Sequence, residues 1–141
     1  MALQSEDLVI RLLQSEYGVA IQRQMTGGKD PGYDGVFTSP MGRISVIEVK
    51  FVSAGTAMKA WPRLRDSIAQ VANSVHNYGW QSPQLIVAIV FENADDIPLA
   101  LPRLKMDDFN ASGDIVIRTF AYDELVRRFR PMQAGPEESE G

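Results

Sequence analysis

The chain has 141 residues, of which 45% are apolar and 23% charged, and these values are typical of one soluble globular domain. The absence of cysteine excludes disulfides, thiolate metal sites and cysteine nucleophiles, and the net charge of −4 argues against a protein that coats nucleic acid by bulk electrostatics. No apolar run approaches the roughly 18 residues that span a bilayer, and no basic segment precedes the first apolar residues, so we expect a cytoplasmic protein with no membrane partner.

The first predicted element is an amphipathic helix over residues 6–18. Apolar side chains recur there at helical spacing, Ser5 precedes the helix, and Gly18 supplies its end. Residues 19–25 favour a short strand, and residues 26–32 are typical of a loop because glycine, proline and polar residues dominate them.

A hairpin is predicted next. Residues 33–39 and 43–52 are typical of strands, and the turn sequence SPMG at residues 39–42 joins them. Since the turn is short, the two strands should pair in an antiparallel ladder, and side chains near their outer ends should lie opposite each other.

The second half of the chain alternates between helix and strand. A helix over residues 57–78 presents an apolar stripe to the sheet, although Pro62 could interrupt it. An almost continuous apolar strand, typical of the centre of a sheet covered on both faces, follows at residues 84–92. An irregular or partly helical surface segment, a strand and a last helix then occupy residues 96–113, 114–120 and 121–130.

This order of elements, α-β-β-β-α-β and then β-α, predicts an α/β or α+β fold in which helices flank a mixed central sheet. We expect a single domain over residues 1–131. Residues 132–141 carry three glutamates and no base, so we expect them to form an acidic, disordered tail.

The second hairpin strand carries two charges in its apolar middle. Glu48 and Lys50 are two residues apart and point to the same face as Val46 and Val52, which indicates burial. Burial of two charges costs several kcal/mol each unless they are paired or coordinated. A short hairpin would also bring Asp34 beside Glu48, with their Cβ atoms about 4.5–5.5 Å apart.

Two carboxylates at that separation repel each other and raise each other's pKa unless a cation lies between them. Mg²⁺ takes oxygen ligands and often keeps several waters, so two carboxylates are enough to hold it. Lys50 could then contact a phosphate oxygen or orient a water, and the set fits metal-assisted hydrolysis of a phosphodiester. The alternatives are a solvent-exposed ion pair of Glu48 with Lys50 on an edge strand, and a turn-forming role for Asp34 beside Gly35.

The segment GYDGVFTSPMGRISVIEVKF, residues 32–51, resembles the hairpin of the PD-(D/E)xK nuclease superfamily. That superfamily includes restriction endonucleases, Holliday junction resolvases and RecB-type nuclease domains. Its pattern is an aspartate, a spacer, and then E-x-K in an apolar strand, and Asp34 and residues 48–50 match it. The proline of the family's name is absent, since Tyr33 directly precedes Asp34 and the nearest proline is Pro31.

The resemblance implies a restriction endonuclease-like core and a nuclease that acts on DNA, with RNA not excluded. It implies that Asp34 and Glu48 bind Mg²⁺, or Mn²⁺, with the backbone carbonyl of Val49 as a further ligand. It also implies that Lys50 acts on the nucleophilic water and the scissile phosphate. A homodimer or homotetramer is expected for a small nuclease that must cut two strands.

Many members of the superfamily place a further glutamate on the first helix. Glu6 is the first choice here, because it lies on the helical line of Val9, Leu13 and Tyr17, and Glu16 is its competitor. A glutamate so early in a helix is also favoured simply by the helix dipole, so this reading of Glu6 stays open as well.

Three polar residues on the predicted second helix, Arg63, Ser67 and Gln70, are further candidates for the site. They lie on one polar stripe with Ser74, and we assign Gln70 to catalysis and Arg63 and Ser67 to nucleic-acid binding. RecB-type nucleases carry a glutamine at the position of Gln70, although an ordinary solvated role remains open for it. Lys29, in the loop before Asp34, is a further candidate for contact with DNA.

Two functions are therefore expected. The first is a Mg²⁺-dependent nuclease that uses Asp34, Glu48 and Lys50. The alternative is a catalytically silent nuclease-like domain that binds nucleic acid or assists assembly.

Overall fold

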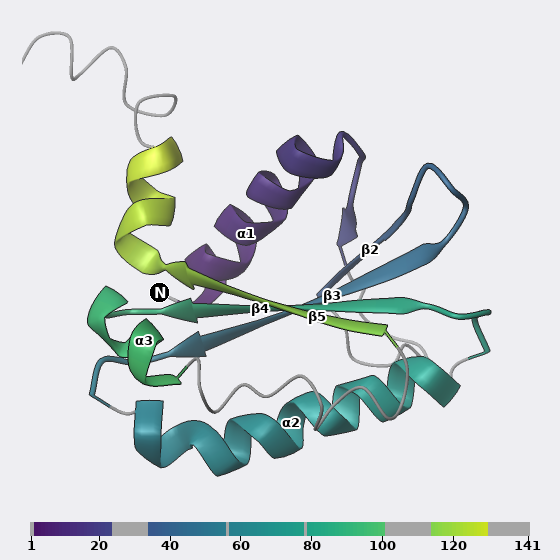
Figure 1. The fold of residues 1–141 in the computed structure, drawn as a ribbon. Helices are drawn as coiled ribbons and strands as arrows, with labels where there is room; N and C mark the ends of the chain where they lie inside the picture. The colour runs from purple at the N-terminus through teal and green to yellow at the C-terminus, as the bar shows by residue number, and fades with distance from the viewer. Residues whose placement is uncertain (1, 24–33, 56, 78, 101–113, 130–141) are drawn as a thin grey trace, which may run out of the picture.

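A five-stranded mixed sheet with helices on both faces organises the chain (Figure 1). The computed structural model describes residues 2–23, 34–55, 57–77, 79–100 and 114–129. The elements in chain order are α1 (Ala2–Tyr17), β1 (Gln22–Arg23), β2 (Gly35–Thr38), β3 (Ile44–Val52), α2 (Ala57–Asn77), β4 (Gln84–Phe91), the 3₁₀ turn η1 (Ala94–Asp96), α3 (Ile97–Ala100), β5 (Asp114–Ala121) and a C-terminal helix over residues 122–129.

The strands lie side by side in the order β1-β2-β3-β4-β5. β2 is antiparallel to both β1 and β3, whereas β4 is parallel to both β3 and β5, so the sheet is mixed as predicted. Parallel neighbours require crossover connections, and α2 and α3 lie in these connections.

The helices form two layers. In Figure 1, α1 and the C-terminal helix lie on one side of the sheet and α2 and α3 on the other. β3 shows the alternation that divides the core: Ile47 packs with α1, while Val46 and Val52 pack with α2. β4 contributes buried side chains to both layers, which explains its continuous apolar sequence. The predicted α/β class and element order are therefore confirmed.

The first helix differs from the prediction at its start. α1 begins by Ala2, and Ser5, expected to precede the helix, is fully buried inside it. A small side chain fits this packed position, and burial outweighs the preference of serine for helix ends. Gly18 ends the helix as predicted, with a φ of 64° and an N–H that donates to the Gln14 carbonyl at 2.9 Å.

The second helix is not interrupted. Pro62 lies within α2, near its start, and the helix continues for fifteen further residues to Asn77. A proline there removes one hydrogen bond of the helix, and burial of Ile68, Ala72 and Val75 against the sheet offsets that loss. The described residues contain no helix long and apolar enough to cross a membrane.

Candidate active site

The hairpin brings Asp34 to Glu48. Gly35 pairs with Ile47 at the end of the antiparallel ladder, Asp34 directly precedes Gly35, and the carboxyls of Asp34 and Glu48 interact. The N–H of Asp34 donates to the Ile47 carbonyl at 2.8 Å, and the Oδ2 atom of Asp34 accepts a hydrogen bond from the N–H of Val49 at 2.7 Å. The Asp34 carboxyl is therefore fixed against the strand that carries the E-x-K sequence.

Glu48 is buried and faces α2. Its residue exposure is 7%, and its Oε2 atom accepts from the Lys50 ammonium at 2.9 Å. Its other carboxyl oxygen, Oε1, is buried without a hydrogen-bond partner among the described residues. A buried carboxylate oxygen without a donor is costly, so this atom is the point of the site that most needs a ligand.

The two carboxyls are electrostatically linked. Burial, as the largest cause, raises the pKa of Asp34 to about 7; the Val49 N–H opposes this shift, and the neighbouring Glu48 and Glu6 carboxyls add to it. Burial likewise raises the pKa of Glu48, although its bond to Lys50 opposes that shift. Without a cation, the pair therefore favours holding a proton near neutral pH, which would also supply a hydrogen bond between the two carboxyls.

Lys50 connects the site to the second helix. Besides Glu48, its ammonium donates to the Ser67 hydroxyl oxygen at 2.7 Å. The Lys50 side chain is 21% exposed, so the ammonium is largely shielded but still reaches solvent.

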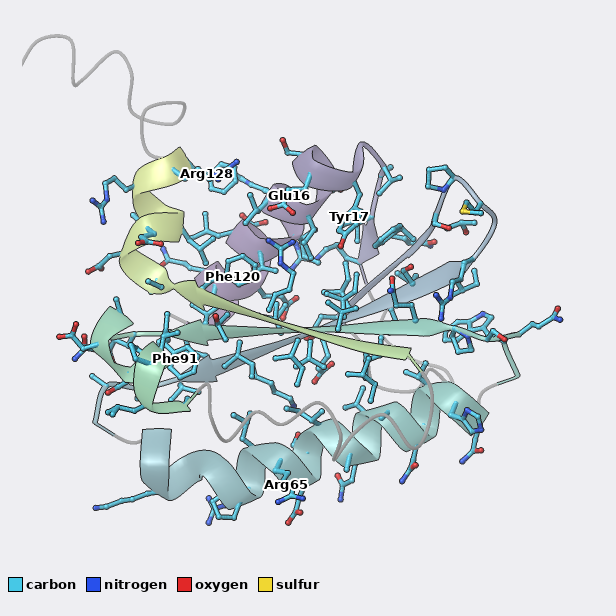
Figure 2. The ribbon with its side chains drawn as sticks, viewed as in Figure 1. Glu16, Tyr17, Arg65, Phe91, Phe120 and Arg128 are labelled. Atoms are coloured by element: carbon cyan, nitrogen blue, oxygen red, sulfur yellow. The ribbon has the colours of Figure 1, made fainter. Side chains whose placement is uncertain are left out.

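Of the two glutamates on α1, Glu6 is the one near the site. Its carboxyl is close enough to Asp34 to raise the pKa of that residue, but its Oε1 atom also accepts from Arg23 at 2.7 Å. Glu16 lies elsewhere, because its two oxygens accept from Arg118 on β5 at 2.6 and 3.1 Å. Figure 2 shows Glu16 beside Phe120 on the face of the sheet opposite α2.

The predicted residues of α2 differ in their contacts with the site. Gln70 and Arg63 are exposed on α2, and neither hydrogen-bonds to any residue in the described part of the chain. Ser67, which we expected to contact nucleic acid, accepts a hydrogen bond from Lys50. Lys29 lies outside the described residues. The sequence did not predict the ion pair of Arg23 with Glu6. No regular spacing relates the two residues, and the fold alone brings them together.

The donor atoms suit a hard cation that keeps several waters. Asp34 and Glu48 supply two carboxyls in contact, and the unpartnered Oε1 atom of Glu48 is the kind of atom that such a cation satisfies. In the described ranges, however, no three acidic, histidine or cysteine side chains gather as a metal cluster. Two carboxylates with backbone and water oxygens are the set that the site can offer.

Comparison with known proteins adds no relative. No family model matches the chain, and neither the curated proteins nor the solved structures contain a match.

Proposed function

We propose that the chain is a metal-dependent nuclease of the PD-(D/E)xK type, with a restriction endonuclease-like core, that hydrolyses phosphodiester bonds of DNA. The observation that supports this proposal best is the buried, unpartnered Oε1 atom of Glu48 beside a carboxyl whose pKa is raised to about 7. A divalent cation would satisfy that oxygen and remove the reason for Asp34 to hold a proton.

In this proposal Asp34 and Glu48 hold Mg²⁺ or Mn²⁺, together with the carbonyl of Val49. When bound, such an ion acidifies water and stabilises negative charge on a phosphate. Lys50 donates an ammonium N–H to a phosphate oxygen or to the attacking water. Its shielded position strengthens that interaction compared with a lysine in bulk water.

The test is a cleavage assay on single-stranded, double-stranded and branched DNA, and on RNA, with Mg²⁺, Mn²⁺ or EDTA. Lys50→Ala should lower the rate by about 100-fold to 10,000-fold, the range for removal of one catalytic proton or charge donor. Lys59→Ala, which removes an exposed lysine from α2, is the matched control and should cleave like the wild type. Cleavage that survives both EDTA and Lys50→Ala would contradict the mechanism.

A second candidate is a nuclease-like domain that binds nucleic acid or assists assembly without cleavage. Two observations favour it: Lys50 already balances the charge of Glu48, and the described residues hold no three-residue metal cluster. Calorimetry with Mg²⁺ and Mn²⁺ separates the candidates. Metal binding that Asp34→Ala abolishes supports the nuclease, whereas the absence of binding at millimolar metal supports the module.

The proposal also includes a homodimer or homotetramer, because one small active site cuts one strand at a time. Sedimentation equilibrium of the purified chain tests this part independently of activity, and a monomer at all accessible concentrations would rule it out.

A further inference from the structure

The Lys50 ammonium is held by two acceptors that come from different layers of the fold. Glu48 Oε2 lies 2.9 Å away on the same strand, and Ser67 Oγ lies 2.7 Å away on α2. A lysine side chain is otherwise flexible, because it has a four-carbon stem and an ammonium group that rotates freely. Two acceptors, one on β3 and one on α2, therefore restrain the position of the Lys50 nitrogen more than either acceptor would alone. We call these two acceptors the anchors of Lys50.

The helix position of the second anchor is itself well determined. Ile68, the residue after Ser67, is fully buried in the layer between α2 and the sheet, and Val75 two turns later is buried as well. Rotation of α2 about its axis would expose these side chains, so packing fixes the direction from which the Ser67 hydroxyl approaches Lys50.

Each anchor takes one of the three N–H donors of the ammonium. In the described part of the chain Lys50 has no third partner, so one N–H is available to a substrate oxygen or a water. The ammonium bonds to the Oε2 atom of Glu48 at 2.9 Å, and its second acceptor is Ser67 rather than the Oε1 atom of Glu48. Glu48 can then keep its Oε1 atom for another ligand.

We propose that Ser67 is a positioning residue for the reaction: it orients the Lys50 ammonium so that one N–H faces the phosphate and Glu48 retains an oxygen for the cation. This inference rests on the proposed nuclease function. It assigns to α2 a part in the chemistry that differs from contact with nucleic acid.

The kinetic test compares Ser67→Ala, Ser67→Val and Ser67→Thr, with Ser74→Ala, at an exposed position two turns later on the same helix, as the control. Loss of the hydroxyl in Ala and Val should lower kcat by roughly 10-fold to 100-fold, the value of one hydrogen bond to a charged group. KM for DNA should change less than about twofold, because the contact is made within the protein. The half-saturating Mg²⁺ concentration should rise, since the freed ammonium then competes for Glu48.

Threonine restores the hydroxyl at nearly the shape of valine, so the difference between Ser67→Thr and Ser67→Val isolates the hydrogen bond from packing. Ser67→Ala should also have no further effect in a Lys50→Ala background. Equal kcat values for Thr and Val, or additive losses with Lys50→Ala, would overturn the inference.

A second readout needs no activity. In protein with ¹⁵N-labelled lysine, the Lys50 ammonium signal should be visible in wild type, Ser74→Ala and Ser67→Thr, and lost to exchange with water in Ser67→Ala and Ser67→Val. If the wild type cleaves no substrate with any metal, the proposed function fails, and the signal alone decides whether Ser67 holds Lys50. If the wild type cleaves but the signal and kcat survive Ser67→Val, only the positioning role fails.

Discussion

Two features of the surroundings of Asp34 favour opposite protonation states of its carboxyl. Its ionised form is the better acceptor for the Val49 N–H, yet burial and two nearby acids favour its protonated form and raise its pKa to about 7. In the unfolded chain the pKa returns to about 3.8. The unfolded state therefore releases this proton first as pH rises, and the stability contributed by Asp34 is complete below about pH 3.8 and is lost as pH approaches 7.

Because the raised pKa makes ionised Asp34 unfavourable to the fold, we predict that Asp34→Asn stabilises the metal-free protein at pH 8 and changes its stability little at pH 4. Asparagine keeps an oxygen for the Val49 N–H but carries no charge. The gain at pH 8 should be on the order of 1–2 kcal/mol, after discounting for the partial exposure of the group.

Urea unfolding in EDTA at the two pH values measures this gain. Asp66→Asn, at an exposed position of α2, controls for the general effect of one lost charge. If Asp34→Asn were less stable than wild type at pH 8, ionised Asp34 would stabilise the fold, which contradicts a net cost of burying its charge.

At the residue scale, local sequence spacing was sufficient to predict which site residues the hairpin brings together, but not which helix residues lie beside them. Asp34 and Glu48 are placed together by a short turn and a strand period of two, both of which are readable from sequence. The residue of α2 that reaches Lys50 depends on the helix rotation, which distant apolar contacts determine, so the sequence did not identify Ser67 as the partner of Lys50. The placement of Glu6 near Asp34 similarly depends on how α1 crosses the sheet.

At the scale of elements, α1 is tied to the two edges of the sheet by ion pairs. Arg23 on β1 binds Glu6, while Arg118 on β5 binds Glu16 through both oxygens and lies 5.1 Å from the centre of the Phe120 ring. Arg118 is the largest cause that lowers the pKa of Glu16, and Arg128 of the C-terminal helix adds to it. Figure 2 shows Arg128 on the same side of the sheet as Glu16.

We predict that Glu16→Gln lowers the free energy of unfolding by about 0.5–1 kcal/mol, because the pair is partly exposed. Cleavage activity should not change, since Glu16 is not near the carboxyl pair. Urea unfolding at 0.05 and 1 M NaCl measures the effect, which salt should diminish. Asp123→Asn, at an exposed position of the C-terminal helix, serves as control. A loss of activity in folded Glu16→Gln would return Glu16 to the site.

The type and order of the elements were predictable, because hydrophobic period, glycine and turn residues are local signals. The start of α1 was not, because the burial of Ser5 is a property of the packed layer. The uninterrupted course of α2 past Pro62 depends on the same kind of contact.

At the scale of the whole molecule, β4 is the centre of both layers. It is parallel to β3 on one side and β5 on the other, and seven of its eight residues are buried. The apolar sequence of β4 predicts a buried strand, but it does not predict which strands lie on either side of it. The structure shows that β3 and β5 flank it.

We predict that Ile89→Ala, in the middle of β4, destabilises the protein by about 2–5 kcal/mol, because the cavity cannot collapse between two packed layers. Leu99→Ala removes a similar side chain that is 55% exposed on α3, and should cost less than about 0.5 kcal/mol. Urea midpoints of both variants test the contrast. Equal losses would mean that β4 does not lie at the centre of the core.

The bond between the Val49 amide and the Asp34 carboxyl has a consequence for hydrogen exchange and local unfolding. A side chain, not a neighbouring strand, protects this amide, and its partner is fifteen residues away along the chain. Breaking it requires only that Asp34 swing away from the end of the β2–β3 ladder, whereas exposing the amides of β4 requires the separation of two packed strands. The Val49 amide can thus exchange by a local opening at the end of the β2–β3 ladder, while the two layers that hold β4 stay closed.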